Sequence, residues 1–313
     1  MNYDEFKQFV TDNVSQFLSD ENQIEEIEEK QIYKNHVALD ALIVRFANIN
    51  ISPTIYMNNF FEDNLSKSDA IEVTKRIAEV IEQNMPMQSL ETGWLSDFDL
   101  VKNLIIPKVV GIKNNEQMLE RLIYSQKADL AVTYSVYLNE FSNKNELSSI
   151  PISRNLAEKW GVSADVLEYT AKNNIQKLYS PCIRDMAFIV PHTMIMLGQM
   201  YVISNRYGVN GAAVFLDDRF MEFVREQLQG DFYILPSSIH EMICMKATND
   251  MRVDELERIV TDINAGQLLP EERLSDHVYK YDYDRHEIYR ADQEQKRQEE
   301  LNASLSMRSH ISR

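Results

Sequence analysis

Pairs of apolar runs separated by short polar turns most constrain how this chain can fold. In "QIYKNHVALDALIVRF", Asn35 and His36 separate two such runs, and both residue types tolerate the left-handed backbone of a tight hairpin turn. "DFYIL" and "HEMICMKA" form a second pair around residues 236–241. Because a short turn joins strands that run in opposite directions, these pairs predict antiparallel sheets.

Amphipathic segments alternate with these strands. Apolar residues recur at three- and four-residue spacing over residues 3–19, which predicts a helix there. The same pattern predicts further helices after Ser68, over 97–110 and 114–124, after Ser153 and Ser163, from about Asp217, and over 253–263. Additional strands are expected over 130–137, 200–204 and 212–216.

This mixed order of elements predicts an α+β fold, with two small and mostly antiparallel sheet-and-helix units joined by a helical middle segment. The first unit is expected over residues 1–95, with one helix, three strands and a second helix. Residues 96–182 are interpreted as a mixed, mainly helical middle, and 183–285 as the second unit. A polar tail over 286–313 is expected to be helical or disordered.

The chain is strongly acidic, with 49 Asp and Glu against 32 Lys and Arg among 313 residues. This net charge of -17 argues against nucleic acid and anionic membranes as partners. The excess is concentrated in the N-terminal third, which favours a protein partner docking there. An acidic decoy of DNA-binding proteins is an alternative that charge alone suggests.

Cysteine usage and the N-terminus indicate where such a chain works. Cys182 and Cys244 are far apart, so they form neither a disulfide framework nor a zinc motif. The start "MNYDEFKQFV" lacks an apolar signal segment, and the apolar region 186–204 is interrupted by polar residues. We therefore expect a bacterial protein of the cytoplasm, with no cofactor and no metal. The loop "YGVNGAA" also lacks the glycine spacing of a phosphate-binding loop.

The turn over residues 236–241 offers the strongest candidates for chemistry. Ser237, Ser238, His240 and Glu241 could supply a nucleophile, a base and a carboxylate. Hydrolase triads usually draw these groups from separate loops, however, and no glycine-flanked elbow surrounds the serines. We favour a turn whose hydroxyls satisfy backbone groups. A second polar group, His277, Asp282, Asp284 and His286, is interpreted as a polar strand face.

The blocks "GVNGAA" and "FYILPSSIHE" resemble a bacterial family of unknown function that is common in anaerobic gut bacteria. "NISPTIYMNNF", "LAVTYSVYL" and "LSDHVYKYD" extend the resemblance to about residue 285 in the same order. The resemblance implies no activity, cofactor or catalytic residue.

The function is therefore not fixed by the sequence. The favoured hypothesis is a non-enzymatic binding or regulatory protein, because each histidine lacks an evident partner and no nucleotide or metal motif is found. The alternatives are a hydrolase that uses Ser237, Ser238 and His240, and the acidic decoy.

Overall fold

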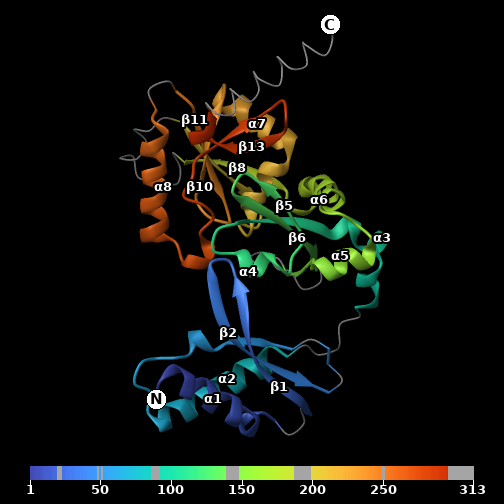
Figure 1. Ribbon diagram of the computed structural model, residues 1–313, viewed down its shortest axis with the longest axis vertical. Coiled ribbons are helices and arrows are strands. Elements are labelled where there is room, and N and C mark those ends of the chain that lie inside the picture. The colour runs from blue at the N-terminus through green and yellow to red at the C-terminus, as the bar shows by residue number, and fades with distance from the viewer. Residues whose placement is uncertain are drawn as a thin grey trace. The chain divides into compact units, whose positions relative to one another are not determined.

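The computed structural model shows an α+β protein whose chain divides into two compact units, Met1–Trp94 and Leu95–Arg313 (Figure 1). It describes residues 1–19, 23–47, 49–50, 52–85, 92–138, 148–186, 199–248 and 251–294. Every strand pair in these ranges is antiparallel. The predicted fold class and the antiparallel character of the sheets are thus confirmed.

The first unit is a three-stranded sheet with two helices on one face. Its sheet has the order β1-β2-β3, and α1 packs beside α2 against it (Figure 1). The core is formed by side chains that include Phe6, Val10, Leu42, Val44 and Ile77, all fully buried. The elements are α1 (Tyr3–Asn13), η1 (Val14–Phe17), β1 (Ile24–Lys34), β2 (Val37–Phe46), β3 (Thr54–Tyr56), η2 (Met57–Asn59) and α2 (Lys67–Gln83).

The hairpin of the first unit turns where the sequence predicts it. His36 has a φ of 59°, and Lys34 lies opposite Val37 in the register, so the turn has two residues. The helix expected after Ser68 is α2, and its N-cap lies two positions earlier, at Ser66. Ser66, and not Ser68, accepts the N–H of Asp69, because the Asp69 side chain returns a bond to the Ser66 N–H and completes a capping box.

The second unit contains two sheets. The smaller one has the order β4-β6-β5, with β7 also paired to β6. Helix α6 packs on it. Its elements are α3 (Phe98–Val101), η4 (Lys102–Leu104), β4 (Ile105–Gly111), α4 (Glu116–Leu119), β5 (Tyr124–Lys127), β6 (Leu130–Tyr137), β7 (Ser149–Pro151), α5 (Arg154–Trp160) and α6 (Ala164–Leu178). A 3-10 helix, η3 (Gly93–Ser96), spans the division between the units.

The prediction of a mainly helical middle is wrong over residues 105–111. This segment is strand β4, in which six of the seven residues are buried. A short, continuously apolar run has no periodicity that separates a buried strand from a buried helix. Pro107 does not prevent the strand, because β4 lies at the sheet edge and its missing N–H can face away from β6.

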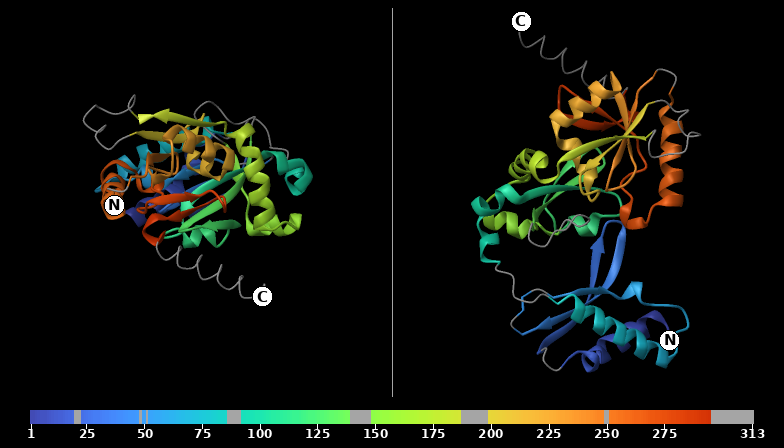
Figure 2. Two further views of the ribbon diagram at one scale, coloured as in Figure 1. Left: turned by 90° about the horizontal axis from the view of Figure 1, so that it is seen from above. Right: turned by 180° about the vertical axis from the view of Figure 1, so that it is seen from behind.

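The larger sheet has the order β13-β12-β10-β11-β9-β8. Helices α7 and α8 lie on its opposite faces (Figure 2). Its elements are β8 (Pro181–Asp185), β9 (Met200–Asn205), η8 (Gly211–Leu216), α7 (Asp218–Leu228), β10 (Phe232–Pro236), β11 (Met242–Lys246), α8 (Val253–Gln267), η9 (Pro270–Glu272), β12 (Tyr279–Asp282), β13 (Glu287–Arg290) and η10 (Ala291–Gln293).

Two further predictions in this unit are wrong. Residues 211–216 form the 3-10 helix η8 and not a returning strand, and all six are buried. The sequence predicts a helical or disordered tail over 286–313, but residues 287–290 form strand β13 at the edge of the larger sheet.

Some predictions fall on residues outside the described ranges. Most of the apolar region 186–204, including His192, and the tail from 295 lie there. Among the described helices, none combines the length and the apolar character needed to cross a bilayer.

Candidate functional site

The predicted cluster at residues 236–241 joins β10 to β11, and its serine hydroxyl serves the backbone. Ser238 is buried, and its Oγ accepts the backbone N–H of His240 at 3.0 Å. The Ser238 N–H is donated to the Glu241 carbonyl at 3.1 Å. These two bonds close a tight turn. Ser238 therefore contacts His240 through the backbone nitrogen of that residue.

The His240 imidazole is also engaged by the backbone. Its Nδ1 accepts the N–H of Asn210 at 3.1 Å, which places the ring proton of the neutral form on Nε2. Nε2 in turn lies 3.9 Å from Oε1 of Glu272. A general base needs an unprotonated nitrogen facing the nucleophile. In His240 that nitrogen already faces a backbone amide.

The remaining contacts of the turn tie it to four other elements. Ile239 donates to the Glu272 carbonyl at 2.8 Å and accepts from Ala212 at 3.2 Å. Ser204 Oγ donates to the His240 carbonyl at 2.7 Å. Glu241 pairs with Arg184 at 3.1 Å. The structure thus brings Ser238, His240 and Glu241 into one turn, and the contacts favour a structural junction over a nucleophile–base pair.

The two sequence blocks that carry the family resemblance meet at this junction. Residues 210–212 of the GVNGAA block contact residues 239–240 of the FYILPSSIHE block through the bonds above. Gly211 makes this approach possible. A Cβ there would lie 2.5 Å from the His240 carbonyl oxygen and 2.7 Å from the Asn205 nitrogen, and it would also collide with Ser204 Oγ.

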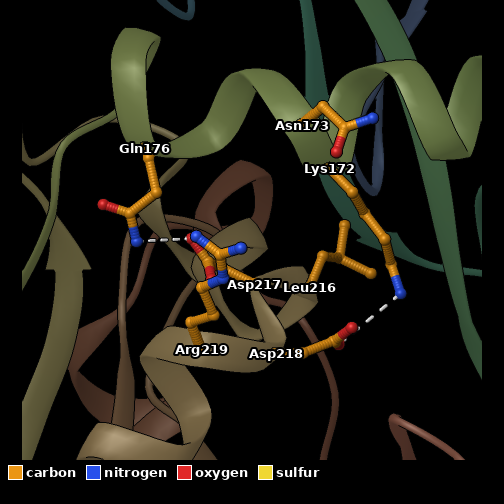
Figure 3. Close-up of a pocket in the computed structure, with 7 residues that line it drawn as sticks. All are labelled: Lys172, Asn173, Gln176, Leu216, Asp217, Asp218 and Arg219. Atoms are coloured by element: carbon orange, nitrogen blue, oxygen red, sulfur yellow. Dashed lines mark hydrogen bonds and ion pairs between the residues drawn. The ribbon is translucent and has the colours of Figure 1, made fainter.

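A second candidate site is a polar pocket that the sequence did not reveal. It is about 210 Å³ in volume and lies between α6 and the start of α7 (Figure 3). Its lining residues are Lys172, Asn173, Gln176, Leu216, Asp217, Asp218 and Arg219. The sequence indicated Asp217 to Arg219 as a helix start, but it gave no signal that α6 would face them.

Hydrogen bonds within the second unit fix both carboxylates of this pocket. Asp217 caps α7 by accepting the Phe220 N–H, and its other oxygen accepts from Gln176 at 2.6 Å. Asp218 accepts from the Tyr281 hydroxyl at 2.9 Å. Burial, followed by this bond to Asp218, raises the pKa of Tyr281, so the hydroxyl stays protonated and remains a donor.

A third cluster joins α8 to the edge of the larger sheet. Ligand atoms of Glu257, His277 and Asp292 all lie within 4.8 Å of one another, which is the arrangement a small cation would need. His277 Nδ1 lies 3.0 Å from Glu257. Both oxygens of Asp292 bind Arg290, and the hydrogen bond from that guanidinium lowers the pKa of Asp292. Both oxygens of Asp292 are thus already occupied by Arg290, and Glu257 is in contact with His277.

The four polar residues expected on one strand face make separate contacts. They are His277, Asp282, Asp284 and His286. His277 turns to Glu257, whereas His286 approaches Asp218 at 3.9 Å. Asp282 accepts the N–H groups of Asp284 and Arg285 and closes the turn between β12 and β13.

The sequence matches one known family. Residues 3–283 match a family described as of unknown function, DUF5688. The predicted resemblance to an uncharacterised family is thereby confirmed, and its occurrence in gut bacteria stays a prediction. No curated protein and no solved structure matches the chain.

Proposed function

The chain belongs to DUF5688, a family of unknown function, and we propose that it is a protein-binding module whose strand β1 receives a basic, extended segment of its partner. The observation that carries this proposal is the outer edge of β1. The strand has 11 residues and stands at the end of its sheet, with no strand on its outer side among the described residues.

The register of the hairpin defines which backbone groups face outward. Next to a two-residue turn, Lys34 and Val37 form a hydrogen-bonded pair, and such pairs alternate along the ladder. The N–H and C=O groups of residues 27, 29, 31 and 33 then point away from β2. Strand β2 shows the same alternation. Asp40 lies opposite Gln31, and its N–H is donated to Asn58 and not to β1.

The charge of the first unit supports a basic partner. Residues 1–94 hold 17 acidic and 7 basic side chains. Four glutamates lie on β1 itself, at positions 25, 26, 28 and 29. Two of them pair with Arg45 and one with Lys7, while Glu25 is exposed. Acidic side chains on an edge disfavour indiscriminate strand pairing, and they attract a complementary strand of opposite charge.

A proline substitution tests this edge directly. Gln31→Pro removes an outward N–H and leaves the hydrogen bonds between β1 and β2 in place. The probe is a fluorescent peptide of alternating Lys and Val, and its fluorescence anisotropy is measured. We expect saturable binding to the full chain, and binding weaker by about tenfold or more for Gln31→Pro, because one bond is lost and the ring blocks the edge.

Gln31→Ala is the matched control, since it changes the side chain alone and should bind as the unaltered chain does. A peptide of alternating Glu and Val should not bind. Equal binding by Gln31→Pro and Gln31→Ala, or equal binding of the two peptides, contradicts strand addition at β1.

We place this activity in the bacterial cytoplasm. Support comes from the two cysteines, Cys182 and Cys244, which are both free thiols. Reducing compartments keep thiols in this state. Burial raises the pKa of Cys244, which keeps its thiol protonated and unreactive.

A further inference from the structure

We propose that the pocket between α6 and α7 binds a small organic carboxylate, held by Arg219 and Lys172. This site belongs to the second unit and is independent of the strand edge proposed above. Its volume of about 210 Å³ would hold about seven water molecules at about 30 Å³ each, which matches a compact metabolite in size.

The hydrogen-bonding capacity left open in the pocket consists mainly of donors. Arg219 has no hydrogen bond and no ion pair to any described residue, and neither has the Asn173 amide. Lys172 lies 3.7 Å from Asp218 and 3.8 Å from Glu168, too far for hydrogen bonds. Three donor groups thus remain for a ligand whose polar atoms are acceptors.

The carboxylates of the pocket accept hydrogen bonds from other residues, and the contact that one of them makes with these donors is the ion pair of Asp218 with Lys172 at 3.7 Å. Both oxygens of Asp217 are bound, by Phe220 and Gln176. Asp218 is held by Tyr281 and lies 3.9 Å from His286. Figure 3 shows the Lys172 side chain reaching from α6 towards Asp218, and Arg219 at the start of α7.

The position of Arg219 in its helix is a second argument. It is exposed and is the second residue of α7, where the helix dipole is positive and a cation is unfavourable. No described acidic side chain pairs with it to offset this cost. The dipole therefore does not favour Arg219 at this position, and its guanidinium remains available to an anionic ligand, whereas Asp217 already caps the helix start.

The charges of the pocket favour a carboxylate over a phosphate. Lys172 and Arg219 balance Asp217 and Asp218, so the lining has no net formal charge. A phosphate dianion would meet two nearby carboxylates without an excess of positive charge. A planar carboxylate matches the fork of one guanidinium and carries a single charge.

Calorimetric titration of the full chain with lactate, a monocarboxylate, and with inorganic phosphate tests the proposal. We expect saturable lactate binding at millimolar concentrations or below, and weaker phosphate binding. Arg219→Gln should weaken lactate binding at least about tenfold, because a bond to a charged group is lost. Lys177→Gln is the matched control. Lys177 is an exposed cation on the same helix as Lys172, it does not line the pocket, and its loss should not change binding.

Thermal unfolding shows whether Arg219→Gln remains folded, and the dipole argument predicts an unchanged or raised Tm. The proposal is overturned if the folded chain binds neither probe, if phosphate binds more tightly than lactate, or if Arg219→Gln and Lys177→Gln bind lactate alike. The peptide test at β1 and this titration probe different units, so either can fail while the other succeeds.

Discussion

Gly211 is the residue on which the junction between the two sequence blocks depends most directly. Its α-carbon lies against the backbone of β9 and of the 238–241 turn, and neither backbone can move alone without breaking the bonds made by Ser204 and Ala212. A glycine is needed here for its size, since no positive φ is required at this position.

Gly211→Ala should therefore destabilise the protein by about 3 kcal/mol or more, because the added methyl group overpacks backbone atoms. Denaturant unfolding measures the change. The control is Gly266→Ala, within α8, where an added Cβ meets nothing within 4 Å. That substitution should be neutral or stabilise by up to about 1 kcal/mol. Equal effects at the two positions would contradict the close approach.

At the same scale, His240 shows how a residue type that suggests catalysis can serve the fold. A histidine between serine and glutamate suggests a nucleophile, a base and a carboxylate, although their closeness in the sequence already favoured a turn. The backbone N–H that donates to Nδ1 comes from Asn210, which is 30 residues away. Spacing along the chain carries no information about such a partner.

Among the elements, α6 is positioned by one buried amide. Asn174 Nδ2 donates to the carbonyls of Lys102 and Ile105 at 2.8 and 2.9 Å, and so joins α6 to the start of β4. The Tyr179 hydroxyl adds a bond to the Pro107 carbonyl at 2.5 Å. Both contacts satisfy carbonyls near the point where β4 begins, at the edge of its sheet.

Asn174→Ala should lower the free energy of unfolding by about 2 kcal/mol, because two buried carbonyls lose their donor. Chemical denaturation checks this value. The neighbouring Asn173→Ala removes an exposed amide from the same helix and should change stability by no more than about 0.5 kcal/mol. A cost for Asn174→Ala as small as that of its neighbour would show that the amide bonds do not position the helix.

For the whole molecule, the division after Trp94 predicts that the first unit folds by itself. Its buried cluster, from Phe6 to Ile81, contains side chains of residues 1–94 alone. This core is enclosed by the three-stranded sheet and by helices α1 and α2, each of which has its own capping box.

A fragment of residues 1–94 should show a cooperative thermal transition and circular dichroism of a mixed α and β protein. Phe6→Ala in the same fragment should abolish or strongly weaken that transition, since deletion of a buried aromatic ring costs about 3–5 kcal/mol. A fragment that is unfolded under native conditions would show that its core depends on the rest of the chain.

The sequence alone determined the features whose causes are local. The hairpin at Asn35 and His36, the helices led by Ser153 and Ser163, and the αL end of α5 at Gly161 follow from turn and capping chemistry within a few residues. The α+β class follows from the order of these elements.

Tertiary structure decided the rest. β4 is a strand because β6 and α6 cover it. η8 is a 3-10 helix because Gly211 packs against a distant turn. Lys172 and Arg219 line one pocket because α6 lies beside the start of α7. Each of these depends on partners far away in the chain, whose positions no local pattern specifies.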